Sequence, residues 1–113
     1  MAIQYSSTLD RTFRALGDES RRKMLATISQ RGQCSANELV EMFNSSQPTI
    51  SKHLRVMEQA GLVVRKVEGR QHFFTMNTAP LEEADKWLQR HLSFWESSLS
   101  RLGEFLDKSK DRE

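Results

Sequence analysis

The stretch that decides the fold is residues 46–63, Ser-Gln-Pro-Thr-Ile-Ser-Lys-His-Leu-Arg-Val-Met-Glu-Gln-Ala-Gly-Leu-Val. It predicts a capped helix that runs directly into a β-strand. Ser46 is a good N-cap, and Pro48 falls in the first turn, where its missing N–H breaks no helical hydrogen bond. Gly61 is typical of a helix end. Apolar residues at spacings of four and three form one stripe that faces a core: Ile50, Leu54 and Met57.

The opposite face of this predicted helix is polar and basic. Hydroxyl, amide and imidazole groups can hydrogen-bond base edges, and cations beside them can neutralise phosphates. We therefore predict DNA contacts from six residues of this face: Gln47, Thr49, Ser51, Lys52, His53 and Arg55. His53 lies at the edge of the buried stripe, so it either meets a base or is a hydrogen-bonded, half-buried residue. An ordinary solvated helix face is the alternative interpretation of the whole set.

Length and composition predict one domain over residues 1–113, since 37% apolar residues can bury a modest core. The net charge of +2 is too small to indicate a nucleic-acid partner, so its distribution matters more. Residues 47–78 carry five Lys or Arg against two acids, whereas residues 79–113 carry six against eight. The positive charge is therefore concentrated around the predicted DNA-contacting helix.

No apolar run approaches the roughly 20 residues that span a bilayer. This predicts a cytoplasmic protein without a membrane partner. Cys34 is the single cysteine and cannot form an internal disulfide, which agrees with a reducing compartment. It is either a partly buried inert thiol or a reactive one that forms an intersubunit disulfide or a mixed adduct.

Three helices are predicted before the opening stretch. The first covers residues 7–16, and the second starts after Asp18 and runs to about Gln30. Ser35-Ala-Asn-Glu38 matches a capping box that opens a short third helix. Residues 35–60 then form two helices joined by a polar turn, which is a helix-turn-helix.

Residues 62–77 predict a β-hairpin, because two runs rich in β-branched and aromatic residues flank Glu68-Gly69-Arg70. This hairpin is the wing of a winged helix-turn-helix with the order α-α-α-α-β-β-α, a mainly α fold with a small β-hairpin (α+β). Its basic groups could reach a phosphate or an adjacent groove: Arg65, Lys66, Arg70 and His72. A solvated turn that happens to be basic is the alternative.

Residues 80–107 predict a long helix with a seam that pairs with another helix. The seam residues step by four and three: Leu88, Leu92, Trp95, Leu99, Leu102 and Leu106. Trp87, Phe94 and Phe105 widen the apolar face, and an isolated domain would leave it in water. We predict a homodimer, with packing of this helix on its own domain as the alternative.

The chain resembles the ArsR/SmtB family of bacterial winged-helix repressors over roughly residues 13–77. The similar blocks stand in the family's order and spacing: Ala15-Leu-Gly-Asp-Glu-Ser-Arg-Arg22, Ser46-Gln-Pro-Thr-Ile-Ser-Lys-His-Leu54, Ala60-Gly-Leu-Val63 and Glu68-Gly-Arg70. The resemblance implies a homodimer joined by the first and last helices, residues 7–16 and 80–107. It also implies an operator near a promoter, release by an inducer, a DNA-reading helix at Gln47–Gln59 and a wing tip at Glu68–Arg70.

The chain departs from the family at its inducer sites. The thiolate sites use paired cysteines, because a soft metal or a persulfide bridge needs two sulfurs close together, and only Cys34 is present. The family's other metal site takes Asp, His and Glu from the last helix, whereas Asp85, His91 and Glu96 stand at other intervals. We therefore expect no metal site and no cofactor, and the resemblance names no inducer.

The sequence thus predicts a dimeric repressor that binds double-stranded DNA at an inverted-repeat operator. A winged-helix module that binds protein instead is the second hypothesis, and the basic groove face argues against it. An enzyme built on Cys34 and His53 is the third, but no orienting acid or oxyanion motif accompanies them. We therefore predict that the protein is not an enzyme.

Overall fold

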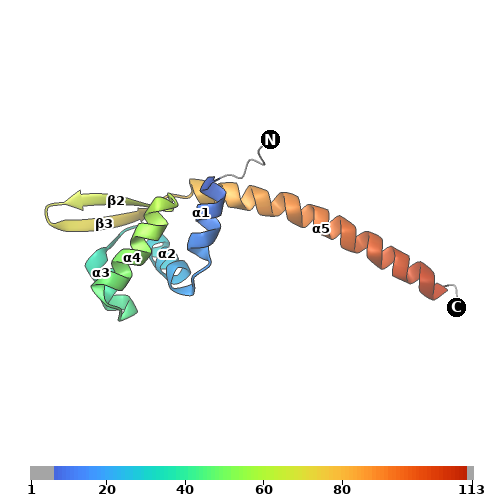
Figure 1. Cartoon of the computed structure of the whole chain (residues 1–113), viewed down its shortest axis with the longest axis horizontal. Helices are drawn as coiled ribbons and strands as arrows, with labels where there is room; N and C mark the ends of the chain where they lie inside the picture. Colours follow the sequence, from blue (N-terminus) through green and yellow to red (C-terminus); the bar gives the residue numbers. More distant parts are fainter. Residues whose placement is uncertain (1–6, 112–113) are drawn as a thin grey trace.

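The computed structural model describes residues 7–111 as a small helical domain with a hairpin on one side and one long helix on the other (Figure 1). The elements follow one another in this order: α1 (Ser7–Leu16), α2 (Glu19–Arg31), β1 (Cys34–Ser35), α3 (Ala36–Phe43), α4 (Gln47–Gln59), β2 (Val63–Glu68), β3 (Gln71–Met76) and α5 (Ala79–Asp111). The predicted order of five helices and a hairpin is therefore present. None of the helices within residues 7–111 is long and apolar enough to cross a membrane.

The sheet contains a strand that the sequence analysis did not predict. Its order is β1-β3-β2, with both pairs antiparallel. In β1, Cys34 lies opposite Phe74, and Ser35 lies opposite Phe73. Two residues show no periodicity, so only the pairing with β3 identifies them as a strand. β1 thereby attaches the start of the helix-turn-helix to the middle of β3, the second strand of the wing.

The core lies between α2, α3, α4 and the sheet. The apolar stripe of α4 is buried as predicted, since Ile50, Leu54 and Met57 are each 1% exposed. Ile28 of α2 and Phe74 of β3 belong to the same buried cluster. Removing any one of these large side chains would cost about 2–5 kcal/mol, because the buried surroundings cannot fully close the cavity. The core therefore fixes which face of α4 points outward.

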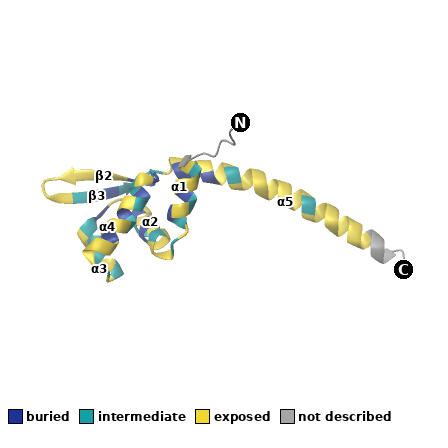
Figure 2. Ribbon diagram, viewed as in Figure 1, coloured by how far each residue is buried: buried dark blue, intermediate teal, exposed yellow. Residues whose placement is uncertain are grey.

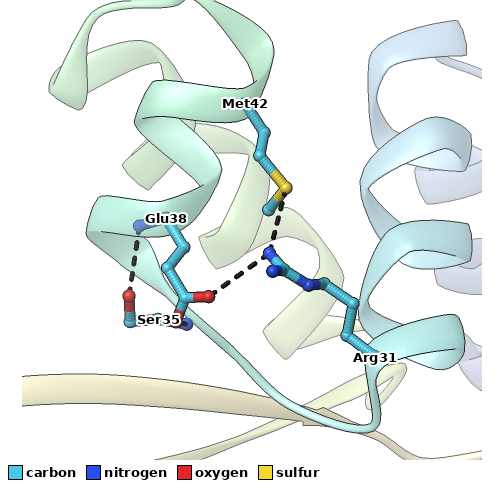
Figure 3. A network of polar contacts seen from close by, with 4 residues as sticks. All are labelled: Arg31, Ser35, Glu38 and Met42. Carbon is cyan, nitrogen blue, oxygen red and sulfur yellow. Dashed lines mark hydrogen bonds and ion pairs between the residues drawn. The ribbon is translucent and has the colours of Figure 1, made fainter.

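The start of α3 is held by the capping box that the sequence predicts (Figure 3). The Glu38 N–H donates to Ser35 Oγ and the Ser35 N–H donates to Glu38 Oε1, each at 3.1 Å. Hydrogen bonding from the Ser35 backbone holds the pKa of Glu38 below its ordinary value. Arg31, at the end of α2, reaches the same carboxylate at 3.3 Å and Met42 Sδ at 3.2 Å. These contacts hold α3 against the end of α2.

The wing turns through a two-residue loop. Glu68 pairs with Gln71, so only Gly69 and Arg70 lie between the strands. Gly69 has φ of 63°, whereas Arg70 has no positive φ. This pattern fits a type II′ hairpin turn, which takes glycine at its first central position. The turn therefore places the Arg70 side chain at the tip.

The long helix α5 leaves the domain after its first turns, and its outer part is mostly exposed (Figure 2). Helix α1 packs only near the start of α5, where the rings of Phe13 and Trp87 meet edge to face at 5.6 Å. The predicted helix at 80–107 is thus present with slightly wider bounds, Ala79–Asp111. Its apolar seam lies outside the core of this chain.

Candidate nucleic-acid interface

Helix α4 begins where the sequence predicts, at an N-cap that also involves one of the candidate DNA contacts. Ser46 has extended backbone angles, φ −69° and ψ 153°, and its Oγ accepts from the Thr49 N–H at 3.3 Å. The Ser46 hydroxyl also donates to Thr49 Oγ1 at 2.8 Å. The Thr49 hydroxyl therefore helps to cap the helix, and its own proton is still able to reach a ligand.

A hollow of about 290 Å³ separates α4 from the wing. Its lining comes from β1, α3, α4 and both wing strands: Ser35, Ala36, Asn37, Gln47, Ser51, Leu54, Arg55, Arg65, Arg70, Gln71, His72 and Phe74. No acidic side chain belongs to this lining. The hollow is therefore polar and basic, and a phosphate backbone or a base edge suits it electrostatically.

The structure divides the predicted DNA contacts into two groups. Gln47, Ser51 and Arg55 stand four residues apart on one row of α4, and they line the hollow together with Arg70 of the wing tip. The other three residues lie outside this lining: Thr49, Lys52 and His53. Gln47, Ser51 and Arg55 are exposed, as are Thr49 and Lys52, whereas His53 is half-buried.

Two of the four basic groups predicted near the wing are already neutralised within the chain. Arg65 forms an ion pair with Glu58 of α4, Nη2 to Oε1 at 2.9 Å, and Lys66 pairs with Glu68 at 3.0 Å. In each pair an acid competes with phosphate for the cation, more strongly for the less exposed Arg65 than for Lys66. Among the described residues, no acid pairs with the other three cations predicted to contact DNA, Lys52, Arg55 and Arg70.

Asn37 and Gln71 line the hollow although the sequence analysis did not select them. Asn37 is one of the two middle residues of the capping box, a position whose side chain takes no part in the cap. Gln71 opens the second wing strand. Both are exposed amides at element ends. Only the packing of α3 and β3 beside α4 brings them to this surface.

His53 is a hydrogen-bonded, half-buried residue, which is one of the two roles considered from the sequence. Its Nδ1 lies 3.3 Å from Nη1 of Arg21 on α2. Asp18 caps α2 next to this pair, and its carboxylate accepts from the Arg21 N–H at 3.0 Å. That backbone hydrogen bond, with smaller contributions from the Arg21 and His53 charges, holds the pKa of Asp18 below its ordinary value.

Cys34 is fully buried in the described structure, and desolvation raises the pKa of its thiol. Burial and a raised pKa both disfavour the reactive thiolate. Within residues 7–111, no group of three or more His, Cys, Asp or Glu side chains is placed to hold a metal ion.

The predicted dimerisation residues all lie on α5 with large exposed fractions: Leu88 42%, Leu92 50%, Trp95 58%, Leu99 62%, Leu102 53% and Leu106 51%. Phe94 and Phe105 of the same helix are 60% and 66% exposed. Trp87 is instead half-buried, because it packs on Phe13 and stacks on His91 at 4.0 Å.

Comparison with known proteins agrees with this architecture. Residues 18–64 match the family model described as bacterial regulatory protein, arsR family. The HTH-type transcriptional regulator YuzN of Bacillus subtilis is 36% identical over 87 residues, which cover 71% of this chain and 95% of YuzN. The chain belongs to the ArsR family. Transcriptional repressor SdpR of the same bacterium is 29% identical over 91 residues, 80% of this chain and 100% of SdpR.

A solved ArsR-like transcriptional regulator from Rhodococcus sp. RHA1 has the same fold. The TM-score is 0.73 at 28% identity, with 88% of this chain and 92% of that chain covered. This likeness confirms the predicted winged helix-turn-helix class. The protein is a DNA-binding transcriptional regulator of the ArsR family, a family of regulators and not of enzymes.

Proposed function

We propose that this ArsR-family regulator is a homodimeric repressor that binds an inverted-repeat operator. The observation that carries the proposal is the row formed by Gln47, Ser51 and Arg55 on α4, which faces Arg70 across a hollow that no acidic side chain lines. If this face were only a solvated surface, there would be no reason for acidic side chains to be absent from the entire lining of the hollow.

The residues of this face divide by chemistry into two roles. Lys52, Arg55 and Arg70 anchor phosphates, because their charges are not paired with acids among the described residues. The short polar side chains meet base edges, where hydroxyl and amide groups select a sequence. These base-contacting residues are Gln47, Thr49 and Ser51.

The dimer follows from the apolar seam on α5. Six large seam side chains of each protomer are 42–62% exposed. Fully burying a large apolar side chain stabilises by about 1.5–3 kcal/mol, and covering a half-exposed one by roughly half of that. Summed over both copies of the seam, the free energy gained by covering these side chains offsets an association cost of about 4–15 kcal/mol.

A second copy of this chain is the partner that fits the seam. Helix α5 has 33 residues and is therefore about 50 Å long, whereas α1 has 10 residues and extends about 15 Å. The Phe13–Trp87 contact lies at the domain end, before the first seam residue, Leu88. Since α1 is too short to follow the whole seam, a helix of similar length must cover it. An identical α5 supplies the same steps of four and three.

A two-fold dimer would present α4 and the wing twice to one face of the duplex. Successive major grooves on that face are about 34 Å apart, so the operator consists of two half-sites related by an inverted repeat. Repression then follows if the operator overlaps a promoter. SdpR is named a transcriptional repressor, which supports repression and not activation by this protein.

Selection of bound duplexes from a random pool tests the proposal. The wild-type protein is expected to enrich an inverted repeat with half-site centres about one helical turn apart. A Lys52→Glu, Arg55→Glu variant should enrich nothing, because its reading face is acidic. Lys86→Glu, Arg90→Glu is the matched control, since it changes the net charge equally at exposed α5 positions outside the seam.

Different results would overturn specific parts of the proposal. Enrichment of a single, unrepeated site would contradict the dimer. Failure of the wild type to enrich any duplex would favour a module that binds protein through the same scaffold.

A further inference from the structure

Arg21 links helix α1 to the reading helix α4 through three donor groups. Its Nε donates to the carbonyl oxygen of Ala15 at 2.8 Å, and its Nη2 donates to that of Arg14 at 3.1 Å. Both carbonyls belong to the last turn of α1, where the regular helical hydrogen bonds end; that of Arg14 also accepts from the Gly17 N–H at 3.2 Å. The guanidinium is thus held by α1, and its Nη1 is left to meet His53 Nδ1 at 3.3 Å.

This contact favours one of the two neutral tautomers of His53. A guanidinium has five N–H donors and no acceptor, so the hydrogen bond forms only if His53 Nδ1 is the acceptor. A neutral imidazole has one N–H, and in this arrangement it must be at Nε2. The planar, fixed fork of Arg21 therefore selects one tautomer of His53.

The Nε2–H of His53 is free to meet a ligand. Among the described residues, no group is hydrogen-bonded to this nitrogen, and no buried side-chain nitrogen or oxygen lacks a partner. An unpartnered Nε2 is therefore not fully buried, in agreement with the half-burial of His53. It lies on α4 next to Lys52 and one turn after Thr49, both of which are exposed.

We propose that Arg21 is a positioning residue that presets His53 as an Nε2–H donor, and that this donor binds a hydrogen-bond acceptor on the operator. The inference rests on the proposed function, because it requires α4 to contact DNA. The acceptor is either a phosphate oxygen or an acceptor on a base edge in the major groove, such as guanine O6 or N7. His53 thus combines the two roles that the sequence leaves open, since one ring nitrogen is bonded inside and the other faces outward.

The first measurement uses the free protein and does not depend on DNA. Imidazole ¹⁵N NMR at about pH 8, above the ordinary histidine pKa of about 6.5, reports which ring nitrogen is protonated. We expect the Nε2–H form of His53 in the wild type and a mixture of tautomers in Arg21→Met. A proton on Nδ1 in the wild type would overturn the proposal.

The second measurement compares His53 variants on the selected operator. A Gln amide can place an N–H near the position of Nε2, whereas an Asn amide reaches only the position of Nδ1. We expect His53→Ala and His53→Asn to lose roughly tenfold in affinity, and His53→Gln to stay within about threefold of the wild type. These variants leave the contacts of Arg21 with the α1 carbonyls in place, and the comparison of His53→Gln with His53→Asn separates loss of the Nε2 donor from loss of the Nδ1 contact.

The pattern of loss distinguishes the two acceptors. Loss confined to one base position in each half-site indicates a base edge, and equal loss on operator and scrambled duplexes indicates a phosphate; both support the proposal. Wild-type affinity in His53→Ala would overturn it while leaving the proposed function standing. No binding of any duplex by the wild type would overturn both.

Discussion

Arg65 of β2 and Glu58 of α4 form a two-point ion pair, with Nε–Oε2 at 3.2 Å and Nη2–Oε1 at 2.9 Å. The same guanidinium reaches His72 Nδ1 at 3.1 Å and lies 5.1 Å from the ring centroid of Phe74. One side chain thus connects the reading helix to both strands of the wing. We therefore expect Arg65 to help fix the angle between the two surfaces that line the hollow, and not to anchor a phosphate.

This ion pair should contribute measurably to stability, whereas the wing pair Lys66–Glu68 should not. The Arg65 and Glu58 side chains are each 36% exposed, and those of Lys66 and Glu68 are 65% and 54% exposed. Double-mutant cycles with Gln at each position, measured by urea unfolding, should give a coupling of about 0.5–1 kcal/mol for the first pair. The second cycle is the control and should be near zero. Equal couplings would contradict a role for Arg65 in fixing the wing.

Replacing Lys52 or Ser51 by alanine should change DNA binding in different ways. Phosphate contacts position the protein, whereas base contacts select the sequence. Lys52→Ala should weaken binding to all duplexes and reduce the salt slope by about one unit, since one fewer counterion is released. Ser51→Ala should keep that slope and relax one position in each half-site, at a cost on the order of 1 kcal/mol.

Binding isotherms on operator and scrambled duplexes at several salt concentrations measure both effects. If neither substitution changes the affinity, α4 does not read DNA. If both reduce the salt slope alike, the assignment of Ser51 to base contact is wrong.

Leu99→Glu should dissociate the dimer and abolish operator binding. Leu99 is 62% exposed in the single chain and lies in the middle of the seam, so a carboxylate there would face the partner's apolar side chains. Ser100→Glu adds the same charge at the next residue, outside the seam, and is the matched control. Sedimentation should show a dimer for the wild type and the control, and a species of 13.1 kDa for Leu99→Glu.

A 13.1 kDa species for the wild type at micromolar concentration would refute the dimer itself. Circular dichroism of Leu99→Glu checks that the helices persist. A folded monomer that still bound the inverted repeat with wild-type affinity would show that the seam is not needed for operator recognition.

Asp18 should make stability depend on pH in the acid range. The Arg21 N–H donates to its carboxylate, and the resulting pKa is lower than the ordinary value of 3.8. A lowered folded-state pKa means that the ionised carboxylate stabilises the fold: this contribution is fully present above pH 3.8 and is lost as the pH falls through the lowered value. Asp18→Asn keeps the N-cap but does not titrate.

Urea unfolding of the two proteins at about pH 7 and about pH 3 measures this contribution. The free energy of unfolding should fall further in the wild type than in Asp18→Asn. Glu19 and Glu38 also have lowered pKa values, but they titrate in both proteins and cancel in the comparison. If the free energy of unfolding falls equally in both proteins, the cap contact does not stabilise the ionised Asp18 carboxylate.

The parts of this protein that the sequence predicts are those made by short-range contacts. The N-cap at Ser46, the capping box from Ser35 to Glu38 and the turn at Gly69 each involve residues within a few positions of one another. Hydrophobic spacing along α4 also identifies its buried face, because the helical period alone determines which residues share a side. The same period predicts the seam on α5.

Contacts between distant segments could not be obtained in this way. The pairing of β1 with β3 joins residues 40 positions apart, Cys34 and Phe74, and a two-residue strand carries no periodic signal. The Arg21–His53 contact joins two helices, and its geometry depends on how α1, α2 and α4 pack. Local pattern does not contain that information.

By itself, the sequence determined the winged helix-turn-helix order, the buried stripe of α4 and the polar residues that face outward, because helix caps, turns and hydrophobic period are local. Only the tertiary structure decided which of those residues lie together. Packing brought Gln47, Ser51 and Arg55 into one hollow with Arg70, and it neutralised Arg65 with Glu58. A cation's availability depends on whether an acid lies within a few ångströms, and side chains distant in sequence come that close only through the fold.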